Sequence, residues 1–185
     1  MGYWEQSLIY PKVVSGGTDT GRQTANSLIV ALVEKYVCEE PGEHSFNASV
    51  TYASDNLISF RYENMWMCSG MPGPDSVSGA VTIDLHTGKD ISLKSQLSNE
   101  SPSNEKNSAE LKDLVVAGLN AIIDKKSADL NCAQANDLGS YYLTVDDFIF
   151  LHLNPAHGGS VCDADYAIPK QQLKAFLRTD SVLLK

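Results

Sequence analysis

The sequence has no hydrophobic run long enough to cross a bilayer, which takes roughly 20 apolar residues in a helix. The longest apolar run covers residues 28–33 and fits the buried face of a helix. Residues 1–6 lack the basic and apolar regions of a signal peptide, although this start could replace one that has been removed. We therefore expect no membrane span in this chain, and export has to be argued from other features.

Basic residues are scarce: 14 Lys and Arg stand against 23 Asp and Glu, and the net charge is −9 at pH 7. Proteins that bind nucleic acid neutralise phosphates with Lys and Arg, so this balance argues against nucleic acid as a partner. An acidic surface favours encounter with a cationic partner, but the same charge could serve solubility alone.

Cysteines are few, and none stands in a Cys-x-x-Cys pair of the kind that zinc sites and thioredoxin-like proteins use. The four are Cys38, Cys68, Cys132 and Cys162. An even count predicts two structural disulfides in a periplasmic or secreted protein, whereas the alternative is four buried thiols in a cytosolic protein. Four cysteines allow three pairings.

Motifs for nucleophilic catalysis and nucleotide binding are also missing. No Gly-x-Ser-x-Gly elbow occurs, and Ser69 or Ser160 would act only if the fold delivered a histidine. Residues 16–23 have the spacing of a phosphate-binding P-loop, but Arg22 stands at its lysine position and Gln23 at its Ser/Thr position. The segment is better explained as a capped helix start, and we expect no cofactor.

Histidines and carboxylates in the C-terminal part offer the best case for a metal site or a hydrolase. His152 and His157 lie close in sequence to Asp163 and Asp165. Their spacing matches no zinc-protease pattern, and Pro155 interrupts any shared helix. We therefore expect no metal and no catalytic residue, and a hydrolase using His152 or His157 is the least favoured alternative.

Length and composition indicate a single globular domain over residues 1–185. In the first half, hydrophobic patterns predict a strand at 8–14, a helix that ends near residue 37, and a meander of alternating strands at 45–52, 57–66 and 77–85. The segment 99–107 is polar and carries Pro102, so we expect a surface loop there.

In the second half, a helical stripe begins near residue 107, strands are expected at 141–144, 148–153 and 166–168, and a short helix follows Pro169. The predicted fold class is therefore α+β. A mainly antiparallel sheet, made of the meander and a C-terminal strand pair, packs against two main helices and a short C-terminal helix.

Large apolar side chains crowd a Gly- and Pro-rich segment at residues 65–75. Met and Trp bury much area, and both types are frequent at binding surfaces. The candidate binding residues are Met65, Trp66, Met67, Met71 and Asp75, together with His157 from a second Gly-rich segment. The alternative is that strand alternation places Trp66 in the core and that the remainder is a plain connection.

Five segments in order resemble the extracytoplasmic domain of RsiV-type lysozyme-sensing anti-sigma factors and PdaC-type peptidoglycan deacetylases. They are LIYP (8–11), NLISFRYE (56–63), VTIDLHTGK (81–89) with ISL (91–93), YYLTVDDFIF (141–150) and YAIPKQQL (166–173). The resemblance spans most of the chain. It implies an extracytoplasmic, noncatalytic domain that binds lysozyme or accompanies cell-wall enzymes.

Two loops depart from the pattern of this family. The family commonly has Gly-Gly-Ala-His after the second meander strand and a Tyr-rich loop before the last strand, where this chain has CSGMP (68–72) and NPAHGGSVC (154–162). Both changed loops carry a cysteine. From this departure we expect Cys68 to bond to Cys162 across adjacent loops, which leaves Cys38 with Cys132.

Together these features predict a noncatalytic periplasmic or secreted domain that recognises lysozyme or another cationic, cell-wall-directed protein. The alternative is an accessory module that holds peptidoglycan glycans on exposed Trp and Tyr side chains.

Overall fold

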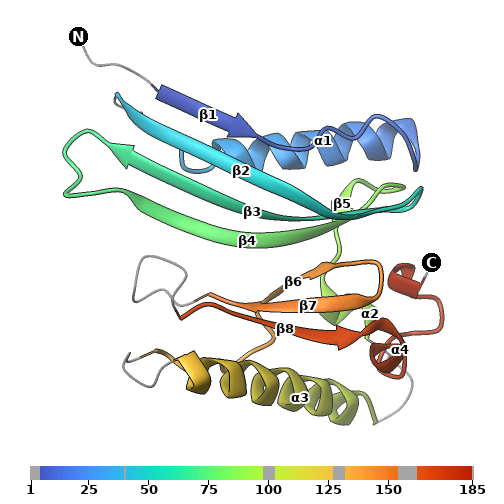
Figure 1. Ribbon diagram of the computed structural model, residues 1–185. Helices are drawn as coiled ribbons and strands as arrows, with labels where there is room; N and C mark the ends of the chain where they lie inside the picture. The colour runs from blue at the N-terminus through green and yellow to red at the C-terminus, as the bar shows by residue number, and fades with distance from the viewer. Residues whose placement is uncertain (1–4, 40, 98–102, 127–131, 154–161, 185) are drawn as a thin grey trace. The chain divides into compact units, whose positions relative to one another are not determined.

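The computed structural model describes residues 5–39, 41–97, 103–126, 132–153 and 162–184, the side chains of residues 5 and 103–107 excepted. The chain divides into two compact units, Met1–Lys89 and Asp90–Lys185. Its strands form two mostly antiparallel sheets, and helices accompany both (Figure 1). The predicted α+β fold class is confirmed, whereas the prediction that residues 1–185 form a single domain stays a prediction.

A five-stranded sheet in the order β1-β2-β3-β4-β5 forms the basis of the first unit. Its strands are β1 (Glu5–Ile9), β2 (Gly42–Ala53), β3 (Leu57–Cys68), β4 (Asp75–Asp84) and β5 (Lys89–Asp90). The strands β2, β3 and β4 form the predicted antiparallel meander, and β1 pairs with β2 in parallel. Side chains alternate between two faces: on β2, His44 and Phe46 are buried while Glu43 and Asn47 are exposed.

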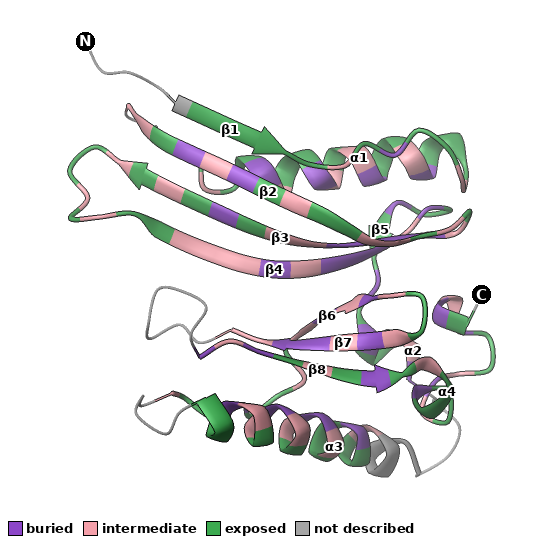
Figure 2. Ribbon diagram, in the orientation of Figure 1, coloured by how far each residue is buried: buried purple, intermediate pink, exposed green. Residues whose placement is uncertain are grey.

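Helix α1 (Asp19–Glu34) covers one face of this sheet. It begins after Thr18, whose Oγ1 accepts a hydrogen bond from the backbone N of Gly21 at 2.9 Å. Figure 2 shows the buried stripe of the helix and the alternating burial along β2. The core joins the helix to the meander and consists of Val13, Ala25, Ile29, Ile58, Phe60, Val81, Ile83 and Leu85.

Two glycines allow α1 and the loop before it to approach the end of β4 closely. Gly17 has a φ of +53°, and a Cβ atom there would collide with the Leu85 carbonyl group. Gly21 lies in the first turn of the helix, and a Cβ atom there would collide with the carbonyl oxygens of Leu85 and His86. Gly17 and Gly21, two glycines of the segment 16–23 that mimics a P-loop in sequence, therefore serve the packing of α1 and its preceding loop.

The first strand lies earlier than predicted, because β1 ends at Ile9 and the predicted strand covers 8–14. Pro11 has no N–H for a strand ladder. Val13 bonds to helix α1 instead: its N donates to Asn26 Oδ1 at 2.8 Å, and its O accepts from Asn26 Nδ2 at 3.0 Å. An amide side chain thus takes the place of a neighbouring strand.

The second unit contains a three-stranded antiparallel sheet in the order β6-β7-β8. Its elements are α2 (Leu93–Gln96), α3 (Ser103–Lys126), β6 (Ser140–Leu143), β7 (Asp147–His152), β8 (Ala164–Pro169), α4 (Lys170–Leu173) and the 3-10 helix η1 (Val182–Leu184). Buried positions of α3 recur every four residues, at Leu111, Val115, Leu119 and Ile123. The helix packs closely on the sheet, since a Cβ atom at Gly118 would collide with the ring of Tyr166 on β8.

The predicted surface loop at 99–107 is wrong for its second part, because residues 103–107 belong to α3. The segment is polar and carries Pro102, a combination that is typical of loops. Glu and Lys are good helix formers, however, and a proline is tolerated before the first turn. Residues 99–102 lie outside the described residues.

The predicted disulfide pairing is wrong: Cys38 bonds to Cys68 and Cys132 bonds to Cys162, each with Cα atoms 5.5 Å apart. The register explains the first pair, because Gly42 pairs with Cys68 and Cys38 precedes Gly42 by only four residues. In the second unit, β6 and β8 both run antiparallel to β7, so the segments before them meet at one end of the sheet. Each disulfide therefore closes within one unit.

Two disulfides are typical of proteins that fold in an oxidising compartment, which indicates an extracytoplasmic protein. Over the residues whose placement is described, the structure contains no helix of the length and hydropathy needed to span a membrane.

Removing either disulfide should destabilise its own unit. Both bridges join cysteines 30 residues apart, and the chain-entropy account assigns roughly 3–4 kcal/mol to a loop of this length. We expect the double variants Cys38→Ser/Cys68→Ser and Cys132→Ser/Cys162→Ser to lose about the same free energy of unfolding in urea. Peptide mapping without reduction provides the control, and recovery of Cys68 linked to Cys162 would contradict the structure.

Gly21→Ala should lower the free energy of unfolding by about 1–3 kcal/mol, although Ala is normally better than Gly in a helix. The added methyl group has to displace backbone carbonyl groups, which cannot rotate away as a side chain can. Gly73→Ala is the control, because a Cβ atom there meets nothing within 4 Å. Thermal unfolding of the two variants measures the difference, and equal stability would be inconsistent with this packing.

Candidate functional site

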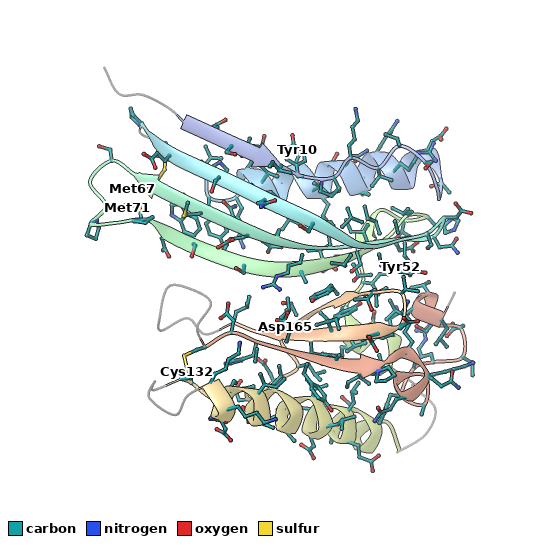
Figure 3. The ribbon with its side chains drawn as sticks, in the orientation of Figure 1. Tyr10, Tyr52, Met67, Met71, Cys132 and Asp165 are labelled. Carbon is teal, nitrogen blue, oxygen red and sulfur yellow. A yellow bond between two sulfur atoms is a disulfide. The ribbon has the colours of Figure 1, made fainter. Side chains whose placement is uncertain are left out.

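The predicted binding segment lies at one end of the first sheet, where β3 ends and β4 begins. Figure 3 labels Met67 and Met71 at this end. A pocket of about 140 Å³ opens here, and we call it the methionine pocket. It is lined by residues of β1, β2 and β3 and of the turn before β4: Ser7, Glu43, His44, Ser45, Met65, Trp66, Met67 and Pro74.

The methionines of β3 lie on the sheet face opposite to α1. Trp66 and Asn64 point to the α1 side, where Asn64 Nδ2 donates to the Leu32 carbonyl oxygen at 3.4 Å. Met65 and Met67 alternate with them and are 44% and 40% exposed. Two large thioether side chains thus stand partly in solvent on a face that is otherwise rich in Ser, Thr and Asn.

Trp66 is separated from these methionines by the pleat of the strand. Its ring stacks on Tyr36, with centroids 4.3 Å apart and an angle of 8° between the planes. Tyr36 follows the end of α1, so the stack joins that segment to β3. Trp66 is half-buried, and its side chain belongs to the packing of α1 on the sheet.

Two further predicted binding residues, Met71 and Asp75, lie around the same turn. Met71 Sδ accepts a hydrogen bond from the backbone N of Cys68 at 3.2 Å, which ties the turn to the end of β3. Asp75 is exposed at the start of β4 and pairs with Trp66. His157 lies outside the described residues.

A buried polar pair lies beside the end of α1. His44 is 2% exposed, and its Nε2 lies 2.8 Å from Asn64 Oδ1. Because Asn64 Nδ2 donates to the Leu32 carbonyl group, Oδ1 is the acceptor and His44 Nε2 the donor. His44 Nδ1 is buried, and no hydrogen-bond partner for it exists among the described residues. The alternation that makes Phe46 a core residue predicts the burial of His44 as well, but its bond to Asn64 has no signal in the sequence.

Acidic side chains lie at this end of the sheet face opposite to α1. Glu43 lines the methionine pocket and is exposed, and it pairs across the strands with Met67. Glu63 is exposed on the same face of β3, two residues before Met65. Arg61 is the basic residue of β3. It precedes Glu63 by two residues and therefore lies nearer the other end of the sheet. The pocket therefore combines apolar thioethers with negative charge.

Of the two histidines considered as catalytic or metal-binding groups, His157 lies outside the described residues, and His152 makes a structural contact, as does His86. His152 Nε2 lies 3.1 Å from the Ala133 carbonyl oxygen, and His86 Nε2 lies 2.8 Å from Asn56 Oδ1. Asp165 Oδ2 accepts from the Tyr142 hydroxyl at 3.4 Å. Across the described residues, no three His, Cys, Asp or Glu side chains lie close enough together to hold a metal ion.

The adjacent carboxylates Asp146 and Asp147 form a turn between β6 and β7. Thr144 Oγ1 accepts from the backbone N of Asp147 at 3.0 Å, and the backbone N of Lys170 donates to the Asp146 carbonyl oxygen at 2.8 Å. Partial burial lowers the pKa of Lys170, and the charges of the two carboxylates oppose this shift. The β6–β7 turn is thus hydrogen-bonded to the first residue of α4.

No family model matches the sequence, and no curated protein matches it. The fold is similar to crystal structures of two DUF3298 family proteins. For the one from Bacteroides fragilis NCTC 9343, the TM-score is 0.55 at 15% identity, over 88% of this chain and 66% of that chain. For the one from Pseudomonas aeruginosa PAO1, the TM-score is 0.46 at 16% identity, over 84% of this chain and 71% of that chain.

At 15% identity the Bacteroides fragilis structure shows a likeness of fold alone, and this chain spans just under two thirds of its length. The more specific resemblance to RsiV-type and PdaC-type proteins stays a prediction.

Proposed function

We propose that this chain is a noncatalytic extracytoplasmic binding domain that docks a protein partner on the sheet face around Met65 and Met67. The exposure of these two methionines, 44% and 40%, beside a pocket is the observation that supports it most directly. Grouped apolar side chains in a polar surrounding mark interaction sites more often than scattered ones do. Methionine adapts its shape to a partner because it is unbranched and polarisable.

Charge favours a cationic partner. The chain carries a net charge of −9, and Glu43 and Glu63 stand on the same face as the methionines. Complementary charge at the edge of an interface speeds encounter and selects the partner, while the apolar centre supplies most of the affinity.

The partner we propose is a cationic, cell-wall-directed protein such as lysozyme, met in the periplasm or outside the cell. Two disulfides support the compartment, and the resemblance of five sequence segments to RsiV-type and PdaC-type domains supports the kind of partner. The absence of a catalytic role is part of the same proposal.

A glycan-binding module remains the second candidate, and it would need flat aromatic rings open to solvent. Trp66 has one ring face stacked on Tyr36. Tyr10 is 42% exposed but packs edge-on against Phe46, with centroids 6.5 Å apart. The described aromatic side chains therefore favour a protein partner over a sugar.

The double variant Met65→Ser/Met67→Ser should weaken lysozyme binding at least about tenfold, because truncating a buried hot-spot side chain costs more than about 1 kcal/mol of binding free energy. Biolayer interferometry with immobilised chain measures the change. Val145→Ser is the matched control, since Val145 is apolar, 75% exposed and lies in the second unit. Equal loss of binding in both variants would argue against this surface.

Raising the salt concentration from about 50 to about 500 mM should slow association with lysozyme, because it screens the attraction between opposite charges. Co-sedimentation with purified sacculi tests the second candidate in the same buffers. Salt-insensitive binding to sacculi with no binding to lysozyme would overturn the proposed partner and favour the glycan module.

A further inference from the structure

We propose that the methionine pocket receives a single basic side chain, arginine or lysine, from its partner. The aliphatic stem of that side chain would lie on Met65, Met67 and Pro74, with its charge at Glu43. This inference rests on the proposed binding function and names the chemical group that the site selects.

The size of the pocket fits one side chain. Its volume is about 140 Å³, whereas pockets for cofactors and drug-sized ligands usually measure about 300–1,000 Å³. A long, narrow group that enters from a partner surface can fill this space, and the stems of arginine and lysine have that shape.

The walls have two chemical characters, and the strand register places them side by side. Met67 pairs with Glu43 and Met65 pairs with Ser45, so on both rows a thioether stands directly across from a polar side chain. Directly opposed residues on antiparallel strands have Cβ atoms about 5 Å apart. An alkyl chain of three or four carbons spans such a distance and presents its charged end to the carboxylate.

Charge and hydrogen bonding favour a cation over other occupants. Neither Lys nor Arg is among the described residues that line the pocket, while Glu43 supplies a carboxylate. The hydroxyl groups of Ser7 and Ser45 can accept further hydrogen bonds from a guanidinium or ammonium group. An acidic side chain would be repelled by Glu43, and an uncharged apolar one would gain nothing from it.

Titration of the full chain with blocked amino acids tests the proposal by ¹H–¹⁵N NMR. The probes are N-acetyl-arginine amide, N-acetyl-lysine amide and N-acetyl-norleucine amide, which keeps an aliphatic stem without the charge. We expect the two basic probes to shift the amide signals of Ser45, Met65 and Met67 saturably. They should bind about three- to tenfold more tightly than the norleucine probe, as a partly exposed charge-assisted contact allows.

Glu43→Gln should abolish this preference, because it removes the charge and keeps the shape. Glu63→Gln is the matched control: it removes one charge from the same sheet face, and Glu63 does not line the pocket. It should leave the preference almost unchanged.

Two results would overturn the inference: equal affinity for the norleucine and arginine probes, or no saturable shift with any probe. Either result leaves the lysozyme measurements standing, since those depend on Met65 and Met67 as a surface. Conversely, selective binding of the arginine probe by a chain that ignores lysozyme would keep the pocket and reject the proposed partner.

Discussion

The pairing of β3 with both of its neighbours determines the organisation of the first unit. This strand pairs with β2 from Ile58 to Cys68, and it pairs with β4 from Leu57 to Trp66. Its pleat sends Phe60, Asn64 and Trp66 toward α1 and sends Met65 and Met67 to the opposite face. One strand thus supplies core residues on one face and the apolar part of the candidate site on the other. A shift of one residue in register would exchange the two sets.

Hydrophobic periodicity carried most of the information about the fold. The alternation through Phe46 predicts β2, and the spacing of Ala25 and Ile29 predicts α1, because both patterns come from burial of one side of an element. Errors arose where a side chain replaced a backbone partner, as Asn26 does for Val13. They also arose at 103–107, where a polar helix start has the composition of a loop.

The candidate site was predictable only in part. Composition alone singled out Met65, Met67 and Met71, since three methionines close together in a Gly- and Pro-rich segment are unusual. The role of Glu43 was not predictable, because it comes from β2 and meets Met67 only through the register. The prediction of the disulfide pairing was wrong for the same reason. The pairing depends on which strand ends come together, and composition does not contain that information.

The position of the two disulfides also affects how the chain would respond to a pulling force. Each bridge joins residues 30 apart, and the loop between them cannot lengthen while the bridge is intact. At about 3.5 Å per extended residue, each bridge withholds roughly 100 Å of contour length. If the ends of the chain were pulled apart, the end of β3 and the methionines beside Cys68 would lie inside a covalently closed loop, while β4 and α3 would lie outside both loops.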